Sequence, residues 1–191
     1  MKMDRKKFKD FLNDNFGMTD GIIMDRLFKH FNKVPTDDLD LEEWVMGFSI
    51  FLKGFDFLGL RIVMFYAKYV IGNEDEKIQF CFDIYDLNED GYISKEEIMT
   101  MMKNCFVYRR AEREEEEGDG VRDLVEMTIR KMDRDRDGRI SFSDFYGTVR
   151  EEPLLLEAFG NCLPSNQAGL AFARKILDKK SLNEMSLSFT R

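Results

Sequence analysis

Apolar residues recur at intervals of three and four along most of the chain, which predicts a succession of amphipathic helices rather than strands. Residues 3–16 and 20–31 carry the first two apolar stripes, with Gly17 between them and Thr19 as the expected cap of the second helix. Similar stripes flank two acidic loops further along, at residues 74–85, 98–105, 121–132 and 145–149. The pattern predicts an all-α fold made of helix–loop–helix repeats.

The first acidic loop, residues 86–97, has oxygen-bearing side chains at positions 1, 3, 5, 9 and 12 and a glycine at position 6. A hard cation needs oxygen ligands on several sides, and the glycine allows the sharp turn that brings alternate residues around it. A capping box between Ser94 and Glu97 would account for only two of these residues. The spacing therefore predicts a calcium site. Its expected ligands are Asp86, Asn88, Asp90, Tyr92 (through its backbone carbonyl) and Glu97.

The second acidic loop, residues 133–144, follows the same spacing with one difference at position 12. Its expected ligands are Asp133, Asp135, Asp137, Arg139 (through its backbone carbonyl) and Asp144. Asp144 is one methylene shorter than glutamate, so its reach as a bidentate ligand is doubtful. Five acidic residues and one lysine give the first loop a formal charge of −4, whereas four acidic residues and three arginines give the second −1. We expect two Ca²⁺ sites, the first tighter than the second, with Mg²⁺ as an alternative occupant at rest. We also expect the two hands to pair through a short strand contact, with Ile93 facing Ile140.

Residues 32–43 form a damaged copy of the same motif. Val34 stands at position 3, where it cannot ligate a cation, and Asp37 replaces the glycine of position 6. The apolar positions around the loop are kept, because Leu39 matches the position of Ile93. We expect a structural hand that has lost its metal.

Residues 55–71 are the most apolar stretch, but they contain Asp56, Arg61 and Lys68. A membrane span needs about 20 residues with few charges, so a buried or surface-lying helix is favoured. The first two loops also start further apart than two helices and one loop require, which indicates an insertion at 55–73. The expected organisation is an N-terminal degenerate hand, the insertion, a paired lobe and a C-terminal helix with a loose tail, at residues 1–54, 55–73, 74–150 and 151–191.

Two further segments are less defined by pattern. The charge run at 109–117 is typical of a solvated helix end and linker. The apolar stretch from Leu154 to Phe159 is either a lid over the paired hands or a last core element.

Composition narrows the function classes. A net charge of −8 without a basic face argues against nucleic acid as a partner. Three cysteines without a CxxC pair indicate reduced intracellular thiols, and the absence of an apolar leader favours a cytoplasmic location. Lys2 follows Met1 where a myristoylated chain has glycine, so no membrane anchor is expected. His30 is the only histidine, and no nucleophile–base pair or phosphate-binding glycine loop stands out, so an enzyme is not expected.

Several strings outside the ligand positions resemble the calaxin family of EF-hand calcium sensors, which is related to the neuronal calcium sensors. These strings are residues 16–20, 23–27, 86–88, 93–97, 123–126 and 150–160. The resemblance implies calcium-dependent contact with the heavy chain or docking complex of outer-arm dynein, on axonemal microtubules of cilia and flagella. The chain departs from the family pattern in the poorer ligand set of residues 32–43, in residues 55–73, and in lacking a helical segment before its start. The alternatives are a regulatory protein of the calcineurin B or neuronal sensor type that serves an enzyme, and a plain calcium buffer.

Overall fold

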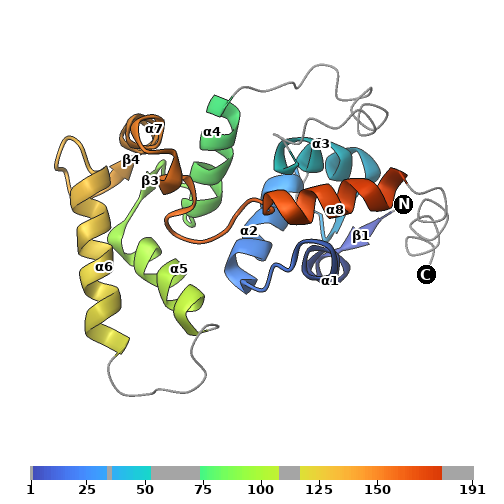
Figure 1. The fold of residues 1–191 in the computed structure, drawn as a ribbon, viewed down its shortest axis with the longest axis horizontal. Helices are drawn as coiled ribbons and strands as arrows, with labels where there is room; N and C mark the ends of the chain where they lie inside the picture. Colours follow the sequence, from blue (N-terminus) through green and yellow to red (C-terminus); the bar gives the residue numbers. More distant parts are fainter. Residues whose placement is uncertain (1, 34–35, 53–73, 108–116, 178–191) are drawn as a thin grey trace. The chain divides into compact units, whose positions relative to one another are not determined.

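The computed structural model describes residues 2–33, 36–52, 74–107 and 117–177 (Figure 1). The chain divides into two compact units, Met1–Asn73 with Leu163–Arg191, and Glu74–Cys162. The C-terminal segment after Cys162 therefore belongs with the N-terminal helices. The predictions for residues 55–73, for most of the charge run at 109–117 and for the last ten residues lie outside the described residues.

The unit Glu74–Cys162 is a pair of helix–loop–helix hands. The first hand consists of α4 (Glu74–Tyr85), β3 (Tyr92–Ile93) and α5 (Lys95–Val107), and the second of α6 (Glu117–Met132), β4 (Ile140–Ser141) and α7 (Phe142–Glu151). The two-residue strands pair antiparallel, with Ile93 opposite Ile140 and Tyr92 opposite Ser141. The predicted all-α fold and the predicted contact of Ile93 with Ile140 are both confirmed.

The short 3-10 helix η1 (Pro153–Glu157) and the residues after it close the core of this unit. Phe159 is fully buried, with its ring centre 5.0 Å from that of Tyr85, whereas Leu154 is 95% exposed. The hydroxyl of Tyr85 donates to the carbonyl oxygen of Gly160 at 2.6 Å, and the Cys162 thiol donates to Sγ of Cys81 at 2.9 Å. Of the two interpretations of the stretch Leu154–Phe159, the core element holds for Phe159, and Leu154 faces out.

The other unit repeats half of this arrangement before its own hand. It contains β1 (Met3–Asp4), α1 (Arg5–Phe16), α2 (Gly21–Phe31), β2 (Asp38–Leu39), α3 (Leu41–Phe51) and α8 (Asn166–Leu177). Strand β1 pairs antiparallel with β2 and places Met3 opposite Leu39, as Ile93 lies opposite Ile140 in the other unit. The predicted helix over 3–16 thus begins with an unpredicted strand. The expected cap at Thr19 is wrong, because Asp20 accepts from the backbone N–H groups of Ile22 and Ile23 instead.

Aromatic rings form the core of this unit. Phe8, Phe31 and Phe51 are almost fully buried. Helix α8 lies across α1 (Figure 1), and its Phe172 places its ring centre 4.9 Å from that of Phe16. On α3, a Cβ atom added to Gly47 would meet the ring of Phe31 at 2.3 Å, so only glycine fits there. Both helices therefore depend on close contact between rings and backbone.

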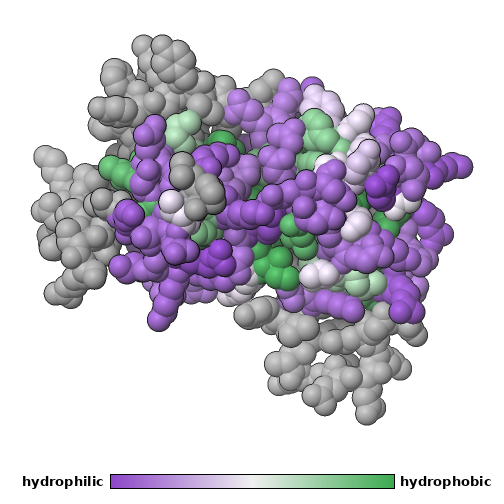
Figure 2. Space-filling view, turned by 180° about the vertical axis from the view of Figure 1, so that it is seen from behind, coloured by the Kyte–Doolittle hydropathy of each residue, from purple (hydrophilic) through white to green (hydrophobic). Residues whose placement is uncertain are grey.

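The surface is mostly hydrophilic on the face drawn in Figure 2, where apolar residues come through only in limited patches. Among the residues that the structure describes, no helix is long and apolar enough to cross a bilayer.

Candidate calcium centre

The first loop begins where α4 ends in the core. Tyr85 is fully buried, which fixes the backbone just before Asp86, and Asp86 is itself only 6% exposed. Both of its carboxylate oxygens accept from the loop: Oδ2 from the N–H of Gly91 at 2.8 Å and Oδ1 from that of Asp90 at 3.2 Å. Gly91 has a φ of +86°, so the predicted glycine turn is present.

The middle of the loop is held by side chains that accept from the backbone two residues further on. Asn88 Oδ1 accepts from the N–H of Asp90 at 2.9 Å, and Asp90 Oδ1 accepts from the N–H of Tyr92 at 2.9 Å. These bonds fold positions 1, 3 and 5 around one centre. The side-chain amide of Asn88 also donates to Oδ2 of Asp90 at 3.1 Å.

Glu97, in the first turn of α5, joins both ends of the loop. Its Oε1 accepts from the N–H groups of Leu87 at 2.8 Å and Asn88 at 3.0 Å. Its Oε2 accepts from the N–H and the hydroxyl of Ser94, both at 2.8 Å. The residue is 7% exposed, and its carboxylate therefore lies inside the loop with an oxygen toward each end, as position 12 requires.

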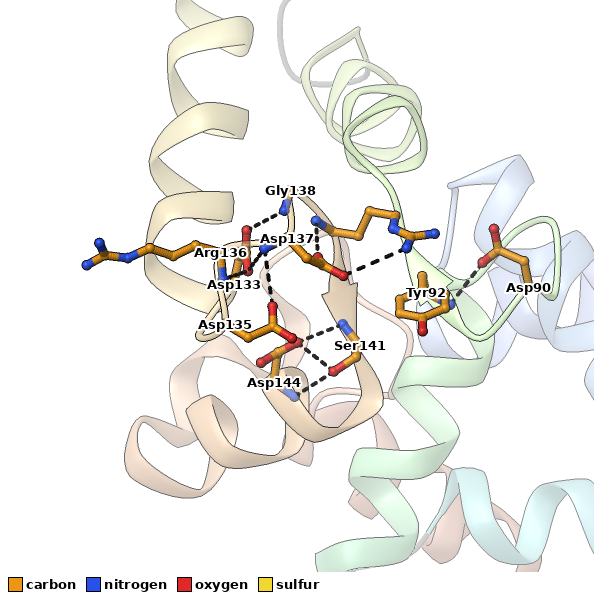
Figure 3. Close-up of polar contacts among 10 residues, drawn as sticks. Asp90, Tyr92, Asp133, Asp135, Arg136, Asp137, Gly138, Ser141 and Asp144 are labelled. Atoms are coloured by element: carbon orange, nitrogen blue, oxygen red, sulfur yellow. Dashed lines mark hydrogen bonds and ion pairs between the residues drawn. The ribbon is translucent and has the colours of Figure 1, made fainter.

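The second loop gathers its carboxylates in the same way (Figure 3). Asp133 accepts from the N–H groups of Arg136 at 2.7 Å and Gly138 at 2.9 Å, and carboxylate oxygens of Asp133, Asp135 and Asp137 lie within 4.8 Å of one another. The N–H of Asp137 favours the charged form of Asp135, but desolvation and the neighbouring carboxylates outweigh it and raise the pKa of Asp135. A divalent cation would relieve this crowding of negative charge.

Position 12 differs between the loops as the sequence predicts. Asp144 keeps the contacts to its own helix end, accepting from the N–H of Ser141 at 3.1 Å and from its hydroxyl at 2.5 Å. Across the loop it makes one long bond, from the N–H of Arg134 at 3.3 Å, where Glu97 makes two shorter ones. The missing methylene therefore costs Asp144 its reach toward the start of the loop.

Both loops fit a hard divalent cation. Their facing groups are carboxylate, amide and carbonyl oxygens, and Asp86, Glu97 and Asp144 are buried acids. Buried carboxylates are costly unless they are paired or bound to a cation, which calcium would supply. The structure thus brings together the side chains predicted as ligands in each loop, with Tyr92 and Arg139 beside them at position 7. The ligand assignments themselves remain predictions.

The degenerate loop is held by its own side chains. The amide of Asn32 donates to the carbonyl oxygen of Thr36, and the hydroxyl of Thr36 donates to that of Asp38 at 2.6 Å. At position 12, Glu43 accepts from the N–H of Asp40 at 3.0 Å in a capping box. A side-chain amide stands where the other two loops have an aspartate, in keeping with the predicted structural role.

Two contacts between the paired hands were not predicted. Lys95 and Glu126 form an ion pair of 2.9 Å between α5 and α6, which lowers the pKa of Glu126. The guanidinium carbon of Arg139 lies 4.1 Å from the ring centre of Tyr92. All four residues stand in the sequence, but only the pairing of the hands brings these side chains together.

Comparison with known proteins agrees with this geometry. The signature of the family described as an EF-hand domain pair matches residues 75–150, which span both acidic loops. Human calaxin (Homo sapiens) is 41% identical over 184 residues, covering 96% of this chain and 78% of the relative. The chain belongs to the calaxin family.

Other relatives lie at different distances. Calaxin of Xenopus laevis is 43% identical over 173 residues, covering 91% of this chain and 74% of the relative. The calcineurin B-type protein of Schizosaccharomyces pombe is more distant, with 32% identity over 124 residues, covering 65% of this chain and 58% of the relative. The resemblance to the calaxins in the sequence strings is therefore confirmed, and the chain is an EF-hand protein of the calcium-sensor type.

Proposed function

We propose that this chain is a non-enzymatic calcium sensor that regulates or helps to dock outer-arm dynein in cilia and flagella. The observation that carries the sensor part is the placement of Glu97. One carboxylate, fixed to the first turn of α5, reaches the backbone of Leu87 and Asn88 at the start of the loop. Any change in how Glu97 meets the loop is therefore transmitted to α5.

The proposed mechanism runs through the exit helices α5 and α7. Calcium, when bound, supplies the positive charge that lets the loop carboxylates approach one another. Glu97 and Asp144 would then exchange their bonds to backbone N–H groups for ligation, and α5 and α7 would move with them. This movement would expose apolar side chains for an amphipathic helix of a partner. Calcium favours that open form only by the difference between its affinities for the two forms.

The dynein part of the proposal rests on membership of the calaxin family, because the strings that carry the likeness lie partly outside the calcium loops. The partner is proposed as the outer-arm heavy chain or its docking complex on axonemal microtubules. This places the protein at the axoneme in the cytoplasm of a cilium or flagellum.

Two measurements test the two parts separately. A hydrophobic dye added to the purified protein should brighten with calcium, and Glu97→Gln, which keeps the size but removes the charge, should abolish this response. Calcium binding without dye response would leave a buffer in place of a sensor. Purified axonemes should sediment the protein when outer arms are present and lose it after the arms are extracted with salt. Equal sedimentation with extracted axonemes would contradict the dynein proposal.

A further inference from the structure

Tyr92 and Arg139 both occupy position 7 of their loops, where the backbone carbonyl is the expected ligand. Their side chains meet where β3 pairs with β4, with the guanidinium carbon of Arg139 4.1 Å from the centre of the Tyr92 ring. This distance is within the range of a cation–π contact. The same guanidinium has Nη2 3.8 Å from Oδ2 of Asp137, the position 5 carboxylate of the second loop. A positive group held by the first hand thus stands beside an expected ligand of the second.

The other two arginines of the second loop are placed differently. Arg134 is engaged with α7, with Nη1 3.0 Å from Oε1 of Glu151. Figure 3 shows the side chain of Arg136 extending away from the group of aspartates. Arg136 has the same charge and belongs to the same loop, so it serves as a matched comparison for Arg139.

We propose that Arg139 sets the calcium affinity of the second loop: its guanidinium, positioned by the ring of Tyr92, opposes a cation at Asp137. The inference rests on the proposed calcium binding by this loop. Two positive groups near one carboxylate repel each other, and a divalent ion doubles the Coulomb energy relative to a single charge. Arg139 and Asp137 are 49% and 37% exposed, so salt screens this repulsion. Because the ring belongs to the first loop, the first hand influences the affinity of the second through a side chain.

The test is a calcium titration followed by amide NMR, with one signal for each loop. Gly138 donates to Asp133 and Gly91 donates to Asp86, so their N–H resonances report on the second and first loops. Arg139→Gln should tighten the response of Gly138 by about three- to tenfold at low salt, and the gain should shrink as salt approaches about 1 M. Arg136→Gln removes the same charge and should give a gain of about twofold or less.

Tyr92→Leu separates positioning from charge. With Arg139 present it should give part of the gain at Gly138, and in an Arg139→Gln background it should give none. In the protein without added calcium, the side-chain Nε–H resonance of Arg139 should carry a ring-current shift that Tyr92→Leu removes. This second readout does not depend on calcium.

Three results would overturn the inference. One is an equal gain from Arg136→Gln and Arg139→Gln, another a gain that does not change with salt, and the third an additive effect of Tyr92→Leu. A Gly138 signal that ignores calcium in the unaltered protein would instead refute calcium binding by the second loop, and this inference with it. The two failures are distinguished by that first titration.

Discussion

Replacing Asp144 with glutamate should strengthen calcium binding by the second loop. Asp144 reaches across its loop with one bond of 3.3 Å to the N–H of Arg134. Glu97 makes two such bonds, of 2.8 and 3.0 Å, from the equivalent position. One added methylene extends the carboxylate by about 1.5 Å, enough to restore the second oxygen contact. One hydrogen bond to a charged group is worth about 1.5–3 kcal/mol, so Asp144→Glu should tighten the second site by about tenfold or more.

The assay is calorimetric titration with calcium, read together with the Gly138 amide signal. Glu97→Asp is the matched control and should weaken the first site by a similar factor. Both substitutions keep the capping box, because Ser94 and Ser141 bond the same way to glutamate and aspartate. An unchanged second-site affinity in a folded Asp144→Glu variant would refute the argument from side-chain length. The difference between the loops would then come from their net charges.

Three further predictions concern the two cores. Gly47→Ala should destabilise the N-terminal unit by about 1–3 kcal/mol, because its Cβ would enter a phenyl ring, whereas Gly120→Ala, with open space around it, should cost nothing; urea unfolding followed by the single tryptophan measures both, and equal effects would refute the steric argument. Phe172→Ala should cost the same unit about 3 kcal/mol by releasing α8, and an unchanged unfolding midpoint would mean that α8 is not held by this ring. Tyr85→Phe removes the donor to Gly160 and should raise amide exchange in α4 through a loss of about 1–3 kcal/mol; unaltered exchange would show that this bond is not needed.

The paired hands could be predicted from the sequence because their geometry is local. Ligand spacing fixes each loop within twelve residues, and Ile93 meets Ile140 because both stand at position 8. The same logic applied to Leu39 should have suggested a strand partner. That partner, Met3, was missed because a strand of two residues leaves no periodic pattern.

The rest depends on contacts that are distant in sequence. The ring of Phe172 meets that of Phe16, and the sulfur of Cys162 meets that of Cys81, although neither residue belongs to a motif. Arg139 was assigned only a backbone role, because loop spacing predicts which carbonyl faces the cation and not where a position 7 side chain goes. Its contact with the ring of Tyr92 became visible only once the strands were paired.

The two acidic loops should bind calcium as an unequal pair, and every proposal above depends on this. A single calcium titration of the unaltered protein, followed by the amide signals of Gly91 and Gly138, measures both loops at once. We predict that both signals shift and that Gly91 completes its shift at a lower calcium concentration than Gly138. Signals that do not move, or a Gly138 signal that responds first, would contradict the unequal pair.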